Sequence, residues 1–332
     1  MLKIFYGRES IDKERFIYKE IGESGKRTLV IVPDQYTLEA EKRAFDVLGA
    51  EALMDIEIIS LSRLGFKVLT ETGGGRQTFI DKYGRHMLLS SIAAEYDDKL
   101  QVFRGSLRKT SFIEMANNFI SEMKQYDVSP EDLAEMGRGV EQGCLLQRKL
   151  SDLQLIFSAY EERIKGKYTD AEDYIDLYMS KIPESSLIRE SDIWVYGFDS
   201  FAPKSEAVLG QLMVSAANVN VFLTGDRDCG DQDLFLLTEI VMENLEKRAA
   251  SLGVSSSRRQ IDSGFDTPGK SPAVSFLERE LFAVAGRRSD ENRGITVVKA
   301  ANMYSEAESA ASFILHLLRD CGLRYRDIVI IC

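Results

Sequence analysis

The stretch L-K-I-F-Y-G-R-E-S-I-D-K-E, residues 2–14, begins with an apolar run, continues through a polar turn and ends in a charged amphipathic segment. The apolar residues 2–6 predict a buried strand, and the segment after residue 12 predicts a helix. Apolar runs at 28–32 and 56–59 are followed by the same kind of turn and amphipathic segment. This alternation predicts an α/β fold with a parallel sheet and helices on both faces.

The alternation stops near residue 72, and residues 79–181 have the spacing of amphipathic helices. Beyond them we predict further strands at 192–196, 219–224, 294–300 and 327–331, and helices at 203–216, 232–252, 273–285 and 304–321. The segment 251–270, rich in Ser, Gly and Asp, is predicted to form a mobile surface loop.

These patterns predict a domain organisation with one interruption. Residues 1–78 and 182–290 are expected to form an α/β domain, with residues 79–181 inserted as a helical domain. Residues 291–332 are expected to begin a second α/β domain. Because the sequence ends on a predicted strand, we expect it to be part of a longer protein.

The net charge of −11 argues against nonspecific coating of nucleic acid, since that affinity comes mainly from Lys and Arg. Residues 60–110 differ, with nine Lys and Arg against five acids, and this cluster is either a solvated helix face or a binding surface. The four cysteines form no C-x-x-C pair and there are two histidines, so we expect a reduced, cytoplasmic protein without a metal site. No apolar stretch approaches the roughly 20 residues of a membrane span.

The turn from Gly7 to Glu14 has the length and setting of the phosphate-binding motif G-x-x-x-x-G-K-[ST]. It departs from the motif at Asp12, which replaces a glycine, and at Glu14, which replaces the hydroxyl that holds Mg²⁺. The motif therefore predicts a degenerate nucleotide site, with candidate residues Gly7, Arg8, Ser10 and Lys13. The alternative is an ordinary strand, turn and helix in which Ser10 caps the helix.

A second nucleotide motif would place acids at the end of a later strand, where they hold metal-bound water. The strand at 192–196 is instead followed by Gly197 and Phe198, and Asp199 lies three residues beyond the strand. We therefore expect no catalytic residue in this chain. The turn Thr224-Gly225-Asp226 could sense phosphate or could be plain turn chemistry.

Two loops at the carboxyl ends of strands, 32–37 and 60–66, carry amide, hydroxyl, guanidinium and aromatic groups. This mixture suits single-stranded nucleic acid, because arginine binds phosphate or base edges and aromatic rings stack on bases. The candidate contacts are Gln35, Thr37, Arg63, Phe66 and Phe198. For Phe66 the alternative is a place in the hydrophobic core.

Five stretches together resemble one family, the B subunit of the bacterial AddAB-type ATP-dependent helicase–nuclease, in its N-terminal portion. They are G-R-x-x-x-x-K at 7–13, V-P-D-Q-Y-T-L-E-A-E at 32–41, I-S-L-S-R-L-G-F-K-V-L at 59–69, Y-G-F-D-S-F-A-P-K-S-E at 196–206 and R-Y-R-D-I at 324–328. The matches run in order along essentially the whole chain.

The resemblance implies a superfamily 1 helicase-like fold of the P-loop NTPase class, acting in repair and recombination of DNA double-strand breaks. It implies that the motor has become a module that scans single-stranded DNA for the Chi signal. The module is expected to act in a heterodimer whose AddA-type partner hydrolyses ATP with Mg²⁺, and the heterodimer is also expected to bind double-stranded DNA. By position, the contacts would be Gln35, Thr37, Arg63 and Phe66, with Phe198 or Phe201 adding an aromatic surface.

The family's 4Fe-4S cluster belongs to a C-terminal nuclease domain that nothing in this sequence matches, so no cofactor is expected here. Two other functions stay open. One is a working P-loop ATPase with an unusual loop. The other is an assembly scaffold whose helical insertion docks the AddA-type partner.

Overall fold

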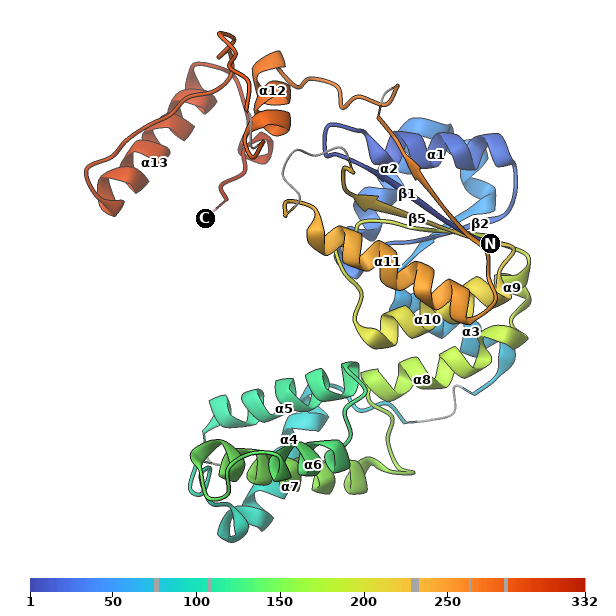
Figure 1. Ribbon diagram of the computed structural model, residues 1–332, viewed down its shortest axis with the longest axis vertical. Helices are drawn as coiled ribbons and strands as arrows, with labels where there is room; N and C mark the ends of the chain where they lie inside the picture. The colour runs from blue at the N-terminus through green and yellow to red at the C-terminus, as the bar shows by residue number, and fades with distance from the viewer. Residues whose placement is uncertain (75–77, 107–108, 228–232, 263, 284–285, 332) are drawn as a thin grey trace. The chain divides into compact units, whose positions relative to one another are not determined.

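The computed structural model describes residues 1–74, 78–106, 109–227, 233–262, 264–283 and 286–331, and it divides the chain into two compact units (Figure 1). Met1–Pro268 contains every strand that the structure describes, and Gly269–Cys332 is a smaller helical unit. Among the described residues, none of the helices combines the length and the apolar character that a membrane crossing requires.

The first unit is built on a parallel sheet, as the sequence predicts, and the sheet has six strands in the described residues. Its strands are β1 (Leu2–Gly7), β2 (Thr28–Ile31), β3 (Ile56–Ile59), β4 (Asp192–Val195), β5 (Asn218–Thr224) and β6 (Ser256–Gln260). The order across the sheet is β3-β2-β4-β5-β1-β6, with every neighbouring pair parallel. The five predicted strands of this unit are confirmed to within a residue at each end.

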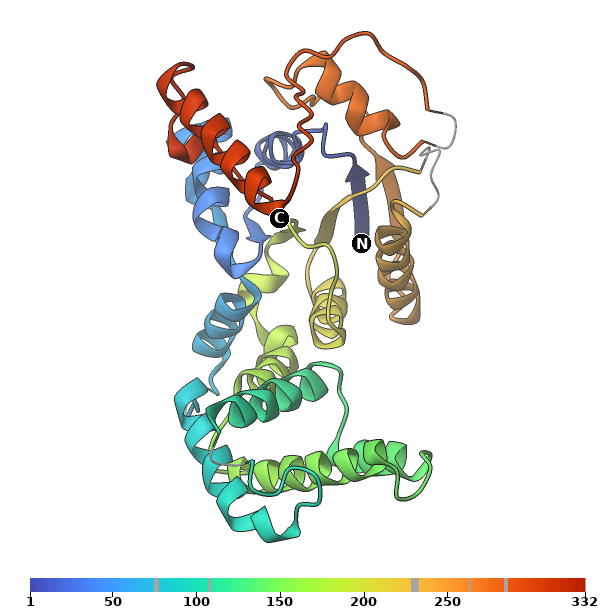
Figure 2. The ribbon, with the colours of Figure 1, turned by 90° about the vertical axis from the view of Figure 1, so that its left-hand side faces the viewer.

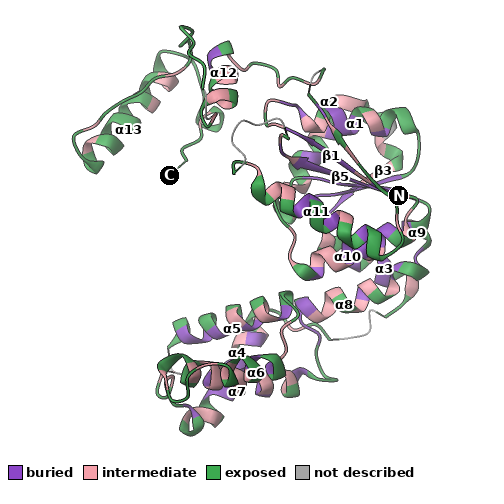
Figure 3. Cartoon of the chain, viewed as in Figure 1, coloured by how far each residue is buried: buried purple, intermediate pink, exposed green. Residues whose placement is uncertain are grey.

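Helices cover both faces of the sheet, because alternate residues of each strand point to opposite sides. Helices α1 (Lys13–Ser24) and α2 (Thr37–Ala52) cover one face, and α3 (Leu61–Thr72), α8 (Ala171–Lys181), α10 (Pro203–Ser215) and α11 (Leu236–Ser251) cover the other. Figure 2 shows α10 and α11 side by side. In Figure 3 the central strands are buried on both faces, so the sheet is the core of the unit.

The predicted helical region begins with four helices in the described residues, and the first, second and fourth of them share a core of their own. The four helices are α4 (Lys82–Tyr96), α5 (Thr110–Gln125), α6 (Pro130–Arg138) and α7 (Leu145–Ile164). Leu89, Phe112 and Phe157 are among the buried residues of that core. Helix α8, which the sequence placed in the same region, instead packs on α3, and its Tyr178 belongs to the core beneath the sheet. The boundary at residue 181 stays a prediction.

One prediction is wrong at the edge of the sheet, where the supposed surface loop 251–270 contains β6. The sequence Ser256-Ser-Arg-Arg-Gln lacks an apolar alternation, so its strand character could not be predicted from hydrophobicity. The strand forms because β1 offers its free edge, and Arg258 holds it to α11 through Glu239 and Glu246. Hydrogen bonds to Glu246, followed by those to Glu239, raise the pKa of Arg258.

The predicted strands at 294–300 and 327–331 are also wrong in the described part of the second unit. This unit contains helices α12 (Pro272–Glu280) and α13 (Met303–Arg319), and a short 3-10 helix at Tyr325–Asp327. A strand needs a hydrogen-bonded neighbour, and the described residues of this unit supply none. Val297 and Ile331 are therefore 90% and 93% exposed.

Candidate nucleic-acid interface

Three backbone amides of the turn between β1 and α1 are hydrogen-bonded within the protein. The N–H groups of Ile11, Asp12 and Lys13 donate to the carbonyls of Arg8, Phe265 and Ile11 at 3.0, 2.6 and 2.9 Å. A phosphate-binding turn works in the opposite way, because it directs free N–H groups at the anion. These amide hydrogens are thus committed within the protein.

The four predicted nucleotide-binding residues are engaged by protein groups. A Cβ at Gly7 would lie 2.9 Å from the carbonyl oxygen of Ile261, so the close approach of the chain after β6 requires this glycine. Arg8 pairs with Asp226 at 2.5 Å, and Lys13 pairs with Glu9 at 3.1 Å. The carbonyl of Ser10 accepts a hydrogen bond from the Thr267 N–H, and the helix is capped by Asp12, so the alternative of a Ser10 cap is wrong.

The two carboxylates that break the motif are held by a single arginine. Arg43 of α2 donates to Asp12 at 2.6 Å and to Glu14 at 3.2 Å. The other oxygen of Asp12 accepts the Arg15 N–H at 3.0 Å, which completes the helix cap. Negative charge at a helix N-terminus is favourable, so these carboxylates take the place that an anionic ligand would occupy.

Glu14 also joins two loops that follow other strands. Its Oε1 accepts hydrogen bonds from the hydroxyls of Tyr36 at 2.8 Å and Tyr196 at 3.3 Å. Burial, and for Tyr36 the hydrogen bond to Glu14, raise the pKa of both tyrosines. Both hydroxyls therefore stay protonated, and remain donors, well above neutral pH. Sequence reasoning missed Arg43, Tyr36 and Tyr196, although three acids in one short turn were a signal that a cation lies nearby.

A pocket of about 530 Å³ lies at the carboxyl ends of β2, β4 and β5 beside this turn. The connection from β1 leads to β2 and the connection from β5 leads to β6, so these two connections cross the sheet in opposite directions. In open α/β sheets, ligands bind where the direction of the connections changes in this way. Three predicted residues, Lys13, Gln35 and Phe198, line this pocket. The structure thus brings together candidates that lie up to 185 positions apart in the sequence.

The remaining candidates lie on neighbouring elements. Arg63 and Phe66 are exposed one turn apart on α3, and Phe66 is 69% exposed, which rules out the core alternative for this ring. Thr37 starts α2 and donates to the Asp34 carbonyl at 3.2 Å. Phe201 packs against Phe198, with 5.3 Å between the ring centroids.

The rim consists of the segments 32–37 and 60–66, which were predicted as loops but are formed largely by a 3-10 helix at Asp34–Tyr36 and the first turns of α2 and α3. The two segments are in contact, since Ser62 Oγ donates to Asp34 Oδ2 at 3.5 Å. This contact follows from the pairing of β2 with β3. Asp199, the nearest acid to the end of β4, is exposed and lies on the wall of the same pocket. Thr224 and Asp226 bind Glu9 and Arg8, so this turn helps to close the loop after β1.

The sequence matches the family model described as ADDB, N-terminal, over residues 4–278. Similar curated proteins are the B subunits of the ATP-dependent helicase/deoxyribonuclease of Alkaliphilus oremlandii, Thermoanaerobacter sp. strain X514 and Bacillus cereus strain B4264, which are 30%, 32% and 30% identical. Each alignment covers 99% of this chain, and the chain spans about 30% of the length of these relatives. Since the family model covers most of the chain, the chain belongs to the AddB family and corresponds to its N-terminal part.

Proposed function

We propose that this chain is the inactive, helicase-like module of an ATP-dependent helicase–nuclease subunit, acting in the repair and recombination of DNA double-strand breaks. It binds single-stranded DNA and scans it for a Chi signal, while an AddA-type partner in the cytoplasmic heterodimer hydrolyses ATP with Mg²⁺. The names of the relatives support the first part, since each is the B subunit of an ATP-dependent helicase/deoxyribonuclease.

The observation that carries this proposal is that amides and charged side chains of the turn after β1 already have partners within the protein. Amides that would hold phosphate donate to protein carbonyls, and Lys13 is paired with Glu9. Glu14 replaces the hydroxyl that would hold Mg²⁺ and binds two tyrosines and an arginine. A nucleotide would have to displace all of these partners to bind.

The rim next to this turn supports binding of a single strand. Phe66 offers an exposed ring for stacking, Arg63 a guanidinium for a phosphate or base edge, and Gln35 an amide for a base edge. These groups lie on the helical turns that follow β2 and β3. Phe198 and Phe201 add a partly buried aromatic pair.

The test is the response to Chi of the reconstituted heterodimer carrying Arg63→Ala and Phe66→Ala. Loss of the stacked ring alone is worth about 1–3 kcal/mol per base, so the double variant should pause at Chi much less often. An unchanged response would refute the proposal. Binding of a labelled ATP analogue with Mg²⁺, lost on Lys13→Ala, would instead support an active P-loop ATPase.

A scaffold function has an observation in its favour, the apolar surface of α4. Tyr83 and Met87 lie one turn apart on this helix and are 76% and 75% exposed. Because α8 packs beneath the sheet, a deletion that tests this function should spare α8 and remove only residues 80–168, between the paired Phe79 and Thr169. Loss of the heterodimer with retained Chi-specific DNA binding would favour the scaffold.

A further inference from the structure

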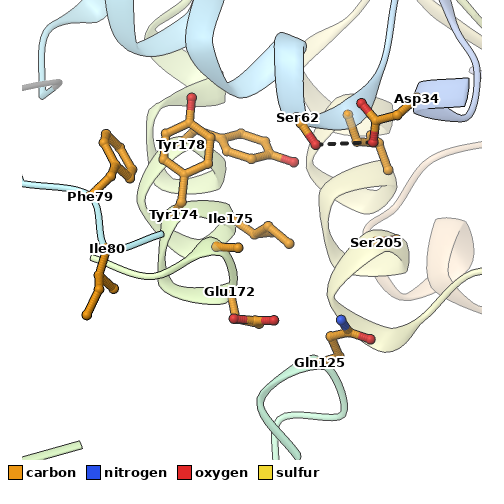
Figure 4. Close-up of a pocket in the computed structure, with 12 residues that line it drawn as sticks. Asp34, Ser62, Phe79, Ile80, Gln125, Glu172, Tyr174, Ile175, Tyr178 and Ser205 are labelled. Atoms are coloured by element: carbon orange, nitrogen blue, oxygen red, sulfur yellow. Dashed lines mark hydrogen bonds between the residues drawn. The ribbon is translucent and has the colours of Figure 1, made fainter. Parts of the chain in front are cut away.

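A second cavity, of about 580 Å³, lies between α3, α8 and the segment Phe79–Ile80 (Figure 4). The rings of Phe79, Tyr174 and Tyr178 lie together on one side of it, and the hydrogen-bonded Ser62 and Asp34 lie on the other. Asp34 and Ser62 directly precede Gln35 and Arg63 in the sequence. The cavity therefore begins where the two loops of the proposed DNA-binding rim meet.

The aromatic wall of the cavity is fixed by close packing. Gly65 of α3 faces Tyr178 so closely that an added Cβ would lie 2.4 Å from the Tyr178 ring. Phe79 packs edge-on against Tyr174, with 5.0 Å between the ring centroids. The rings are thus ordered without a ligand, which lowers the entropic cost of binding one.

The segment that carries Phe79 is held by backbone hydrogen bonds to the chain entering α8. The Ile80 N–H donates to the Thr169 carbonyl at 3.1 Å, and the Thr169 N–H donates to the Thr78 carbonyl at 3.0 Å. Phe79 is nevertheless 51% exposed. A rigid, half-exposed aromatic ring gains free energy when a flat apolar surface covers it.

The charges of the cavity select against phosphate. Among the described residues, no Lys or Arg lines it, and its charged groups are the carboxylates of Asp34 and Glu172. Glu172 is buried and paired with Arg85 at 3.0 Å, whereas Asp34 is exposed. The cavity therefore offers aromatic faces and a hydrogen-bond acceptor, which suit a planar group that carries an amine.

We propose that this cavity receives one unstacked nucleobase of the single strand that follows the rim, an inference that rests on the proposed function. The base lies against Phe79 and Tyr174, and its phosphate stays outside the acidic cavity. Asp34 accepts a hydrogen bond from an exocyclic amine, so adenine, cytosine or guanine is preferred to thymine, which has none.

The test is equilibrium binding of single-stranded oligonucleotides to the full-length protein in its heterodimer, with one abasic site moved along the strand. In the wild type, an abasic site at the position that fills the cavity should weaken binding about fivefold or more, as expected for a lost stacking contact. With Phe79→Ala, whose ring is half exposed, this position-specific loss should disappear. Asp34→Ala should equalise the affinities for cytosine and thymine at the same position.

Two variants serve as controls. Tyr174→Phe keeps the ring and should keep the wild-type profile, whereas Tyr174→Ala should remove the loss at the same position as Phe79→Ala does. Phe66→Ala should weaken binding through a different position of the strand and leave this loss in place. Phe79→Ala should leave the unfolding midpoint of the sheet domain within a few degrees of the wild type, whereas Tyr174→Ala removes a ring that packs on the core and should lower the midpoint further.

Two results overturn the inference, provided that Arg63→Ala still weakens binding. One is that Phe79→Ala and Tyr174→Ala both retain the wild-type dependence of affinity on the abasic position, and the other is that the wild type shows no such dependence. A flat profile combined with loss of the AddA-type partner from the Phe79→Ala protein would assign the cavity to a protein segment, and this also overturns it. If Arg63→Ala has no effect on binding, the proposed function itself fails.

Discussion

The Tyr36 hydroxyl donates a hydrogen bond to Glu14 Oε1 at 2.8 Å, and this bond joins the turn after β1 to the rim loop that contains Gln35. The same oxygen accepts the Tyr196 hydroxyl, one residue before the Gly197 turn that leads to Phe198. Glu14 stands where a phosphate-binding motif has a hydroxyl for Mg²⁺. In this chain Glu14 instead holds the segments that carry Gln35 and Phe198, and both of these residues line the pocket at the carboxyl ends of β2, β4 and β5.

Replacing Glu14 with threonine restores the motif's hydroxyl but removes the acceptor shared by the two tyrosines. We expect Glu14→Thr to lower the free energy of unfolding by about 2 kcal/mol, since hydrogen bonds to a charged group contribute about 1.5–3 kcal/mol. Urea unfolding measures the loss. ATP binding should not appear, because the amides of Ile11, Asp12 and Lys13 remain bonded.

The matched variant Tyr36→Phe removes one hydroxyl and keeps the ring, which packs edge-on against Tyr196. It should cost about 1 kcal/mol and should reduce the discrimination between Chi-containing and scrambled strands. Discrimination equal to that of the wild type would show that Glu14 only stabilises the fold.

A methyl group at Gly7 meets the chain that follows β6. We expect Gly7→Ala to destabilise the protein by about 1–3 kcal/mol, because the new Cβ would lie 2.9 Å from the Ile261 carbonyl oxygen and strain the core. Gly137→Ala, within α6, is the matched control, since the nearest atom to the new Cβ would be Leu150 Cβ of α7 at 4.0 Å, and alanine there should stabilise the helix. Thermal unfolding of both variants measures the difference, and equal midpoints would contradict this explanation.

Lys124 of α5 carries a buried charge that fixes the start of α8. Its Nζ lies 2.8 Å from Asp170 Oδ2, and Asp170, which is completely buried, caps α8. Burial alone would raise the pKa of Asp170, but the ion pair with Lys124 lowers it. Lys124→Met leaves this carboxylate unpaired and should cost about 3–5 kcal/mol in urea unfolding.

The control for this variant is Lys247→Met, which removes an exposed pair with Glu243 on α11. Its cost should stay below about 0.5 kcal/mol. The double variant Lys124→Met with Asp170→Asn should recover part of the stability lost in the single variant. If the two single variants were equally stable, the buried pair would not matter.

The fold could be predicted where hydrophobic periodicity is strong. The apolar strands β1 to β5 stand out in the sequence, as does the helical stretch between residues 79 and 181. The strand β6 is polar and exists because β1 offers an edge to it, a tertiary effect that no local pattern carries. The wrong strands at 294–300 and 327–331 make the same point, since apolar residues form a strand only beside a partner.

The sequence allowed candidate residues to be chosen by residue type and strand position. It did not reveal the hydrogen bonds and ion pairs that connect the segments around them. Gln35 and Phe198 could be assigned to one rim because the carboxyl ends of parallel strands meet at one edge of the sheet. The contact of Arg43 with Asp12 and Glu14 depends on how α2 packs on α1. The aromatic cavity also depends on packing, since Phe79 and Tyr174 belong to segments joined by the bridge from Phe79 to Thr169.

The most direct test of the central claim is a salt-dependent titration of single-stranded DNA with the wild type, Lys13→Ala and Arg63→Ala, each alone and with the AddA-type partner. We expect Lys13→Ala to bind like the wild type. Arg63→Ala should bind about fivefold or more weakly, with a salt slope reduced by about 1 if the arginine contacts a phosphate. The central claim is that this helicase-like fold binds DNA through its rim and not through the degenerate phosphate-binding turn. It would be contradicted if Lys13→Ala weakened DNA binding and Arg63→Ala left it unchanged.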